Sequence, residues 1–590
     1  MPSVRIELRP CPAQEVDTLG RALGLSPVAA QVLVRRGLAD PAAARLFLEG
    51  EPEHELSRFA GIEPIAALVL EHVRSGSPIT IHGDYDVDGV CATAVLLHTL
   101  RALGARADSY LPDRAGDGYG LNAATIARLA ERGTRLLITV DCGITAIDEV
   151  AAARAAGMEV LITDHHAPSG RGLPDAPILH PVLCGYPCEE LCGTAVAFKL
   201  AQALTRAAGA DPAPVESDRD LLALATIADS VPLHGENRTI VRHGLRALAC
   251  TLKPGLRALM SRARVDPGRI DERAVSFGLA PRLNAAGRLY RADAALELLM
   301  TEDRARAEQI AEELDRANSE RRDTETRVLF EAEAQVASLP ARPGYVLAGE
   351  GWHAGVIGIV ASRLAERHHR PFVLVALDGE LGKGSARSIE DFDLVAALAA
   401  CAPQLRRFGG HRAAAGLEVD RSALQDFGAA FIEHAGATLS EEALVPRVTV
   451  DAVAEGTELG LELAEELRAL APFGQGNPPV SLLIRSAGIS DLRTMGQGRH
   501  LRFALHADGA SMNAVAFGFG GRGALRREIA GGGAFDGVFR LEVNEWNGKT
   551  EPRLNLIHLQ TAERGAKAIG FEDGVPYPVR DARRDHTLAG

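Results

Sequence analysis

The chain has 590 residues, which is too long for one hydrophobic core and predicts about three or four domains. Its apolar content of 46% and its modest charge density exclude a mainly disordered chain. The formal net charge of −14 argues against a protein that simply coats nucleic acid, although a local basic groove would be compatible with it. No apolar run reaches the length of a membrane span, and the first residues lack the pattern of a secretory signal. We therefore expect a cytoplasmic protein that does not enter a membrane.

An α/β domain is predicted after a short N-terminal segment. Residues 1–61 carry short helical patterns and are interpreted as a lead-in. The domain is expected to span residues 62–300. In its first part, Ala-rich helical stretches alternate with short apolar runs, three of which we expect to be strands: Pro78–His82, Arg135–Val140 and Glu159–Thr163. A turn-rich segment, Ala167–Pro187, and further helix through Leu298 are expected to follow. Strands that alternate with helices predict a parallel, doubly wound sheet.

A long helix and a second α/β domain are predicted next. The segment Thr301–Ser338 is polar and charged and contains no helix breaker, so residues 301–340 are interpreted as one connecting helix. Residues 341–440 then return to the alternating pattern. Their predicted strands are Tyr345–Ala348 and Phe372–Leu377, and their predicted helices are Gly358–Arg367 and Leu394–Ala400.

The last domain is predicted to be a small β-barrel. Residues 441–565 show a two-residue alternation of apolar and polar side chains, for example in Leu501–His506 and Phe539–Val543. Asn547 and Gly548 form a hairpin signal between the last two strands. Four or five strands over this length favour a barrel of the OB type. The tail, residues 566–590, is polar and expected to be loosely ordered.

The sharpest chemical feature is the segment HGDYDVDG, in which His82, Asp84, Asp86 and Asp88 occupy every second position. It follows a predicted strand directly, and alternate residues of an extended chain face the same side. Three crowded carboxylates repel one another unless cations neutralise them. A loop of solvated aspartates is the alternative, but such a loop would rarely lie between an apolar strand and an apolar helix. We therefore predict a metal site.

Two further motifs end the other predicted strands. Asp141 follows LLITV, and Asp164, His165 and His166 follow VLIT. Because the carboxyl ends of parallel strands meet at one edge of a sheet, we expect these side chains to converge with the first motif. Asp229 closes the apolar run LLALATIA. Alone, Asp229 would be read as a helix-terminal residue, but beside the other motifs it is read as a ligand.

Oxygen and imidazole ligands without thiolate suit Mn²⁺ or Mg²⁺. The candidate ligands exceed the needs of one ion and fit two ions about 3.5–4 Å apart. A two-ion site of this kind activates water and stabilises a leaving oxygen, so hydrolysis of a phosphate ester or anhydride is predicted. The candidate ligands are His82, Asp84, Asp86, Asp88, Asp141, His165 and Asp229.

These motifs, in this order, resemble those of the DHH superfamily of phosphoesterases, and the resemblance extends from about Ile62 to Gln560. It implies that His82, Asp86 and Asp141 hold one ion and that Asp88, Asp141, His165 and Asp229 hold the other. Asp141 would then bridge the two ions, and His166 would contact the scissile phosphate. The resemblance leaves the role of Asp84 open between a ligand and a group that orients His82 or a bound water.

Further motifs resemble the RecJ family within that superfamily. The resemblance implies a 5′-phosphate site made by Arg114 with Ser385 and Arg387 of the KGSARS motif, which is interpreted as a glycine-rich loop. A second such loop, GGHRAAAG, and a helix N-terminus after His353 would also bind phosphate. Trp546 on the last hairpin would stack on bases, or else belong to the barrel core. The other residues assigned to substrate binding are Arg282, Asn284, Arg288, Gly409, Gly410 and His411.

The resemblance implies an exonuclease that degrades single-stranded DNA from 5′ to 3′ in repair and recombination. A single-strand binding protein and a recombination helicase are implied as partners, and a monomer is plausible because the domains could enclose the site alone. An oligoribonucleotide or cyclic-dinucleotide phosphodiesterase would share the chemistry but lack the barrel. An inorganic pyrophosphatase would lack the GGH motif. A non-catalytic DNA-binding homologue would have lost ligands, whereas all the expected ligand types are present here.

Overall fold

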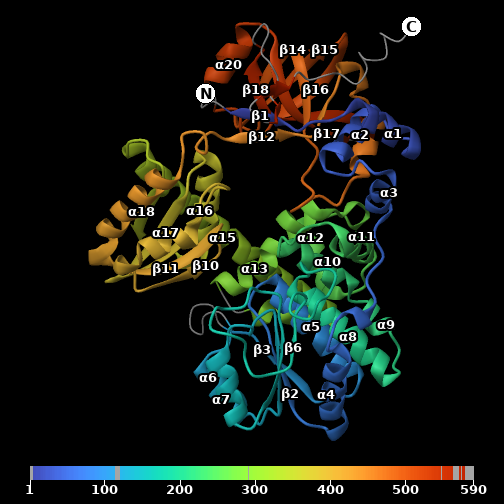
Figure 1. The fold of residues 1–590 in the computed structure, drawn as a ribbon, viewed down its shortest axis with the longest axis vertical. Helices are drawn as coiled ribbons and strands as arrows, with labels where there is room; N and C mark the ends of the chain where they lie inside the picture. Colours follow the sequence, from blue (N-terminus) through green and yellow to red (C-terminus); the bar gives the residue numbers. More distant parts are fainter. Residues whose placement is uncertain are drawn as a thin grey trace. The chain divides into compact units, whose positions relative to one another are not determined.

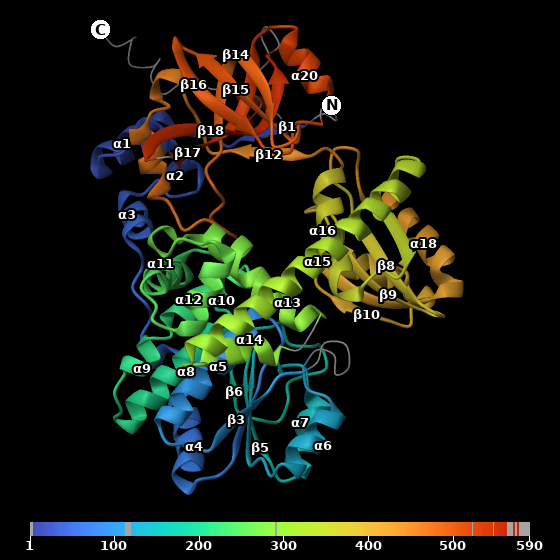
Figure 2. The same ribbon diagram turned by 180° about the vertical axis from the view of Figure 1, so that it is seen from behind.

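The chain divides into two units in the computed structural model (Figure 1, Figure 2). The structure describes residues 4–112, 120–289, 292–521, 523–546, 548–562, 570–572 and 575–577. One unit, here called the α/β unit, comprises Pro52–Leu444 and Gly474–Gly476. The other, here called the barrel unit, comprises Met1–Glu51, Val445–Phe473 and Asn477–Gly590. Among the helices described, none is both long enough and apolar enough to cross a bilayer.

A five-stranded parallel sheet with the order β3-β2-β4-β5-β6 organises the first part of the α/β unit. The three strands predicted from the sequence are confirmed as β2, β4 and β5. Two strands were not predicted: β3, which is half exposed, and β6, which has only two residues. The bounds are β2 (Ile79–His82), β3 (Ala107–Tyr110), β4 (Leu136–Val140), β5 (Glu159–Thr163) and β6 (Ile178–Leu179).

Helices cover both faces of this sheet, as the doubly wound prediction requires. One core contains Ile138 of β4 together with α4 (Ile62–Ser75) and α5 (Val87–Ala102). A second core contains Leu137 together with α6 (Ala123–Glu131) and α7 (Ile147–Ala155). Successive residues of a strand point to opposite faces, so Leu137 and Ile138 belong to different cores.

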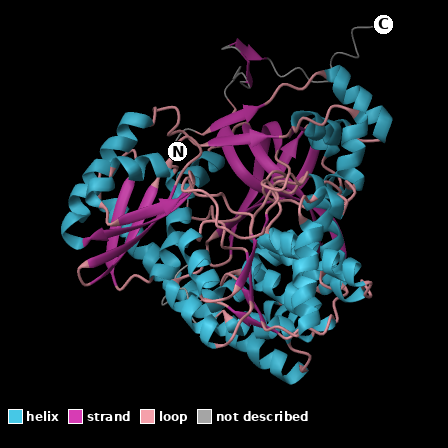
Figure 3. Ribbon diagram, turned by 60° about the horizontal axis from the view of Figure 1, so that its bottom comes forward, coloured by secondary structure: helices cyan, strands magenta, loops and turns pink. Residues whose placement is uncertain are grey.

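Between β6 and Ser338 the elements that the structure describes are all helices. Figure 3 shows the helices and strands of the chain in separate colours. The long helix predicted from the sequence is α15, and it begins at Arg304 because the side chain of Asp303 accepts a hydrogen bond of 2.8 Å from the Ala305 N–H. A π-helical turn, Ala274–Leu279, precedes α13. The helices are α8 (Gly193–Ala208), α9 (Ala213–Glu216), α10 (Arg219–Ala228), α11 (Gly235–Ala249), α12 (Pro254–Ala263), α13 (Ala280–Leu289), α14 (Asp293–Met300) and α15 (Arg304–Ser338).

A second, mixed sheet with the order β10-β11-β9-β8-β7 completes the α/β unit. KGSARS and GGHRAAAG, which were expected to be loops, lie mostly on strands, and that expectation was wrong. Gly384 allows close packing within the sheet, since a Cβ there would lie 2.6 Å from Leu417 Cδ1. The elements are β7 (Tyr345–Glu350), α16 (Ala354–His368), β8 (Phe372–Asp378), β9 (Leu381–Arg387), α17 (Leu394–Ala400), β10 (Arg407–Gly410), β11 (Ala414–Asp420) and α18 (Leu424–Thr438).

The barrel unit is built on the sheet order β13-β14-β15-β16-β18-β17, which closes through pairing of β14 with β17. The predicted β-barrel is therefore confirmed. Strand β14 was not predicted, because its alternation is interrupted where Ser486 and Asp491 adopt positive φ angles of 51° and 53°. The bounds are β12 (Arg447–Val450), β13 (Ala452–Val453), α19 (Leu461–Arg468), β14 (Leu482–Met495), β15 (His500–Ala507), β16 (Ala510–Ala516), α20 (Gly523–Ala530), β17 (Phe535–Trp546) and β18 (Lys549–Thr561).

The N-terminal segment belongs to the barrel unit. Strand β1 (Arg5–Leu8) pairs in parallel with β12, and helices α1 (Ala13–Leu23) and α2 (Pro27–Arg35) share one core with the barrel strands. Helix α3 (Pro41–Glu49) contributes Ala44 to the same core. The N-terminal segment is thus packed against the C-terminal barrel, and no local sequence pattern predicts this contact.

Candidate active site

The carboxylates and histidines singled out in the sequence gather at one edge of the parallel sheet. His82 ends β2, while Asp141 and Asp164 directly follow β4 and β5. Because β4 pairs with both β2 and β5, the carboxyl ends of these three strands are adjacent. Asp229 reaches the same place from the C-terminal end of α10.

The loop between β2 and α5 folds tightly around its aspartates. Asp86 caps α5, and its side chain accepts hydrogen bonds from the backbone N–H groups of Asp88 at 3.0 Å and Gly89 at 3.1 Å. A Cβ on Gly89 would lie 2.4 Å from the backbone nitrogen of Asp84, so glycine is required there. The final glycine of HGDYDVDG therefore has a steric role.

The N-terminus of α8 binds one of the carboxylates and lies against another. Asp88 accepts backbone hydrogen bonds from Gly193 at 2.6 Å and Thr194 at 2.8 Å, where the partial positive charge of the helix end favours an anion. A Cβ on Gly193 would lie 2.6 Å from the Asp141 Cβ. The sequence analysis missed Gly193 and Thr194, because nothing local distinguishes them from an ordinary helix start.

Three groups of side chains have ligand atoms within 4.8 Å of one another. Asp141 belongs to two of the groups, and Asp84, whose role the sequence left open, stands with Asp86 and Asp141. Within the described part of the chain His82 belongs to none of them. Its buried ring stacks on Tyr110, and its Nδ1 lies 3.7 Å from Cys142 Sγ. The groups are Asp84, Asp86 and Asp141; Asp88, His165 and Asp229; and Asp141, His165 and His166.

The two histidines of the third motif have different partners. His165 Nε2 lies 3.1 Å from Asp141 Oδ1, whereas His166 Nδ1 lies 2.8 Å from Asp164 Oδ1. Burial alone would lower the pKa of His166, but the hydrogen bond and charge of Asp164 outweigh it and raise the pKa to about 9. The sequence analysis placed Asp164 in the motif without giving it a role, and the structure gives it the role of fixing His166.

The buried carboxylates destabilise one another in their charged form. Burial, reinforced by Asp88 and Asp86, raises the pKa of Asp229 to about 8. Burial and the neighbouring carboxylates raise the pKa of Asp141 well above its ordinary value. A cluster of this kind favours either bound protons or bound cations. Its carboxylate and imidazole donors fit Mn²⁺ or Mg²⁺.

Residues 281–289, with the sequence PRLNAAGRL, contain Arg282, Asn284 and Arg288 and support the aspartate loop. Asn284 Oδ1 accepts a hydrogen bond of 3.1 Å from the Val87 N–H, and a Cβ on Gly287 would lie 2.5 Å from the carbonyl oxygen of Tyr85. Arg282 donates to Asp315 Oδ1 of α15 at 2.8 Å. Arg114 and the side chain of Arg288 lie outside the described residues. Asn284 thus orients the start of α5, and Arg282 ties α13 to α15.

The predicted phosphate-binding residues of the second sheet gather around the start of α16. His353 caps this helix, accepting a hydrogen bond of 3.0 Å from the Gly355 N–H. A Cβ on Gly358 would lie 2.9 Å from Ser385 Oγ and 3.0 Å from Arg387 Nη2, so the absence of a side chain there admits both groups. The Arg387 Nη1 also donates to Ser385 Oγ at 3.0 Å.

Glycines border Ser385 across the sheet. Gly416 of β11 is in register with both Ser385 of β9 and Gly409 of β10, and a Cβ on Gly409 would meet no atom within 4 Å. Gly410 has a φ of 142°, and the His411 N–H donates to the Ala414 carbonyl oxygen at 2.8 Å. In the barrel unit Trp546 pairs with Lys549 across the predicted hairpin, and its side chain lies outside the described residues.

Comparison with known proteins places the chain in a class and a family. Family models match the DHH family N-terminal domain at residues 78–228, the DHHA1 domain at residues 335–437 and the RecJ OB domain at residues 450–558. The first two domains, with the carboxylate and histidine cluster described above, define a DHH phosphoesterase. With the RecJ OB domain and the relatives described next, the chain belongs to the RecJ family.

The relatives cover nearly the whole chain. The chain is 39% identical to the single-stranded-DNA-specific exonuclease RecJ of Bacillus subtilis, over 95% of this chain and 71% of the relative. It is 33% identical to the protein of that name from Escherichia coli, over 94% of this chain and 99% of the relative.

Solved structures of a relative share the fold of this chain and contain Mn²⁺ or Mg²⁺. RecJ from Thermus thermophilus in complex with Mn²⁺ matches 95% of this chain and 80% of its own, at 33% identity and a TM-score of 0.83. The same protein in complex with Mg²⁺ matches with a TM-score of 0.77 at 32% identity, over 95% of this chain and 79% of its own. The predicted cofactors, Mn²⁺ or Mg²⁺, are therefore supported by both the donor set and the relatives.

Proposed function

We propose that the chain is a metal-dependent exonuclease that hydrolyses single-stranded DNA from its 5′ end, in DNA repair and recombination. One observation supports hydrolysis by two metal ions: Asp141 belongs to two groups of potential metal ligands at the edge of the sheet. The assignment of single-stranded DNA as the substrate is supported by relatives that are named single-stranded-DNA-specific exonuclease and match more than 90% of the chain.

The ligand assignment combines the three groups with the family resemblance. We assign Asp84, Asp86 and Asp141 to one ion, and Asp88, His165 and Asp229 to the other. By resemblance, His82 is added to the first ion and Asp141 bridges to the second. When bound, the two ions would supply an activated water and neutralise the charge of the scissile phosphate. The protein holds the ligands in place through the N-terminal amides of α8 and the cap of α5.

The remaining side chains handle the substrate. His166, fixed by Asp164 and held protonated, would donate a hydrogen bond to the scissile phosphate. Ser385 and Arg387, together with Arg114, would bind the 5′-phosphate, and the glycines around Ser385 would let the strand approach the sheet. A 5′-phosphate anchored at one fixed place would explain cleavage from that end. The barrel, with Trp546, would bind the strand further along.

The alternative substrates are less well supported. An oligoribonucleotide or cyclic-dinucleotide phosphodiesterase would need the two α/β domains but not the barrel at residues 450–558. The oxygen and imidazole ligands form close groups here, which argues against a non-catalytic homologue. By resemblance to the family, we propose a monomer that acts in the cytoplasm with a single-strand binding protein and a recombination helicase.

Digestion of end-labelled substrates tests this function. The protein with Mn²⁺ is offered single-stranded DNA labelled at the 5′ or the 3′ end, the matching duplex and a short RNA. We expect rapid release of the 5′ label as short products, while the 3′ label remains in long, slowly shrinking fragments. Preference for the duplex or the RNA, or early release of the 3′ label, would refute the assignment.

A further inference from the structure

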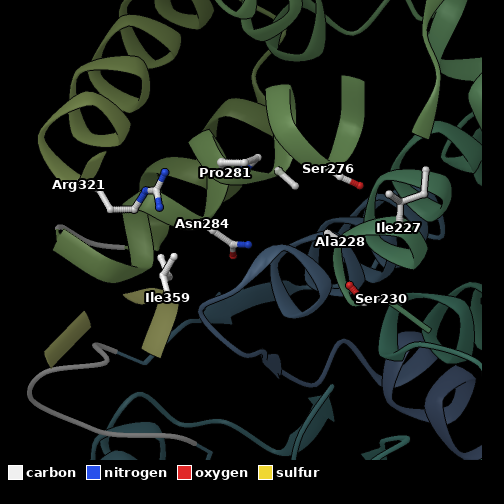
Figure 4. Close-up of a pocket in the computed structure, with 9 residues that line it drawn as sticks. Ile227, Ala228, Ser230, Ser276, Pro281, Asn284, Arg321 and Ile359 are labelled. Carbon is white, nitrogen blue, oxygen red and sulfur yellow. The ribbon is translucent and has the colours of Figure 1, made fainter. Parts of the chain in front are cut away.

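A pocket of about 210 Å³ lies inside the α/β unit beside the metal centre (Figure 4). Its lining comes from segments far apart in the sequence, including Ser230 after α10, Asn284 of α13, Arg321 of α15 and Ile359 of α16. Figure 4 shows the guanidinium group of Arg321 and the amide of Asn284 on the same side of this space. The pocket therefore combines elements of the first α/β domain, the connecting helix and the second α/β domain.

The pocket adjoins the metal centre at two points. Ala228 and Ser230 line it, and these residues flank Asp229 in the sequence. Asn284 also lines it, and the same side chain binds the Val87 N–H next to Asp86. Anything held in the pocket is thus close to the carboxylate cluster.

On its other side the pocket adjoins the pair proposed to bind the terminal phosphate. Ile359 lines the pocket, and it follows Gly358, the residue against which Ser385 Oγ and Arg387 Nη2 pack. A strand with its end at Ser385 and Arg387 and a phosphodiester at the metal centre would pass along this space. Arg321 lies in the wall of this space but is not among the residues that the sequence motifs assigned to substrate binding.

Arg321 is fixed in the pocket wall by its neighbours on α15. Its Nε and Nη2 donate to Asn318 Oδ1 at 3.2 and 3.0 Å, and its Nη1 donates to Glu325 Oε2 at 3.0 Å. Each terminal nitrogen carries a second N–H that none of these bonds uses. A guanidinium held in this way is preorganised to bind an anion through the remaining N–H groups.

The positive charge around Arg321 also favours a bound anion. Glu325 is only 1% exposed and pairs with Arg321 on one side and with Arg363 Nη2 on the other, at 2.7 Å. The two guanidinium groups share this one carboxylate, which leaves the cluster with an excess positive charge. The Arg321 side chain is 11% exposed, so that charge is poorly screened by water. The side chain of Arg363 is 53% exposed and does not line the pocket. The excess positive charge that is buried beside the pocket is therefore that of Arg321.

We propose that this pocket holds a phosphodiester of the single strand next to the scissile one, and that Arg321 binds it. The inference rests on the proposed function and adds a residue of the connecting helix to the substrate contacts. Ser276, Ser230 and Asn284 supply further polar groups around the same space. Because Arg321 would bind the phosphate and not a base, the contact would not depend on sequence.

Substitution of Arg321 tests the contact, with Arg363 as the matched control. Both arginines pair with Glu325, so Arg321→Gln and Arg363→Gln each remove one partner of the same carboxylate. With Mn²⁺ and 5′-phosphorylated single-stranded DNA, we expect Arg321→Gln to raise KM about tenfold or more and Arg363→Gln to change it less than twofold. Arg321→Lys, which keeps the charge, should recover part of the loss. Equal effects of both Gln variants, or an unchanged KM in Arg321→Gln, would overturn the proposal.

Neutral linkages in the DNA identify the contact itself. A single methylphosphonate, which removes the charge of one phosphodiester, is placed at successive positions from the 5′ end, and first-product release is measured in single turnover. At the linkage next to the first one cut, we expect the methylphosphonate to slow product release by the unsubstituted protein. In Arg321→Gln, which has already lost the contact, the same methylphosphonate should not slow product release further. Independent effects of the two changes at all positions would overturn the proposal.

The same assay separates this inference from the proposed function. If the unsubstituted protein does not release the 5′ nucleotide from single-stranded DNA, the proposed function fails. If it does so while Arg321→Gln behaves like Arg363→Gln, the function stands and only the pocket assignment fails. Thermal unfolding of each variant shows whether it is folded.

Discussion

His166 Nδ1 lies 2.8 Å from Asp164 Oδ1, and the same carboxylate oxygen accepts the backbone N–H groups of His165 at 2.7 Å and His166 at 3.1 Å. The other oxygen accepts the Ile144 N–H at 2.9 Å. Asp164 thus ties the two histidines to the turn that follows Asp141. Because a carboxylate only accepts hydrogen bonds, this contact places a proton on Nδ1 of His166.

Removal of the Asp164 charge should therefore impair catalysis more than metal binding. In Asp164→Asn the pKa of His166 should fall, and we expect kcat to decrease about a hundredfold, with Mn²⁺ affinity changed much less. Steady-state kinetics and calorimetric titration with Mn²⁺ measure the two effects. Asp148→Asn, at an exposed residue paired with Arg171, serves as a control. An equal loss in metal affinity and kcat would contradict the role assigned to Asp164.

A single methyl group at the start of α8 should disturb the metal centre. In Gly193→Ala the new Cβ would lie 2.6 Å from the Asp141 Cβ, so the carboxylate must move. We expect activity to fall at least about tenfold with weakened Mn²⁺ binding. Gly428→Ala in α18, where the nearest atom to a new Cβ is 3.8 Å away, should leave both unchanged. Normal activity in Gly193→Ala would show that the close approach is not required.

Much of the fold could be predicted from local sequence patterns. The buried strands β2, β4 and β5 are short apolar runs that alternate with Ala-rich helical stretches, and α15 is a long polar segment without a breaker. The pairing of β1 with β12 could not be predicted, since it joins segments more than 400 residues apart. The glycine motifs around Gly384 and Gly410 were taken for loops because glycine is depleted in strands, whereas these two glycines permit close packing on strands.

The candidate site divides in the same way. Asp84, Asp86, Asp88, Asp141 and His165 stand at the ends of predicted strands, so their convergence follows from the topology of a parallel sheet. The backbone amides of Gly193 and Thr194, and the side chain of Arg321, carry no local signature. The two amides bind Asp88, which lies 105 and 106 residues earlier in the sequence, and the pocket of Arg321 is completed by residues from other helices. The sequence predicted that Asp84 lies near the other ligands but left its role open, because that role depends on where its side chain points within the loop.

Asn284 is expected to act through the loop that it supports. In Asn284→Ala the Val87 N–H loses the acceptor that lies 3.1 Å away, and the start of α5 becomes less constrained. We expect kcat to fall about tenfold and the apparent Mn²⁺ affinity to weaken, with thermal stability lowered by no more than a few degrees. Asn284→Asp, which keeps an acceptor, should recover part of the activity. Unchanged metal affinity in Asn284→Ala would contradict this positioning role.

The metal-free protein should lose stability as pH rises. The pKa of Asp229 in the folded protein is raised to about 8, above its unfolded value of about 4, so the folded state binds its proton more tightly. This contribution is fully present below about pH 4 and is lost as pH rises towards about 8. Bound cations replace the protons, so stabilisation by Mg²⁺ should grow over the same range. Unfolding temperatures with EDTA and with Mg²⁺, at several pH values, measure this difference. A difference independent of pH would contradict the carboxylate-cluster account.

The most direct test of the central claim compares the unsubstituted protein with Asp141→Ala on single-stranded DNA in the presence of Mn²⁺. Asp141 is the carboxylate shared by two ligand groups, so its loss should abolish hydrolysis while binding of the strand, measured by fluorescence anisotropy, is retained. Hydrolysis by Asp141→Ala at a rate near that of the unsubstituted protein would contradict two-metal catalysis at this site.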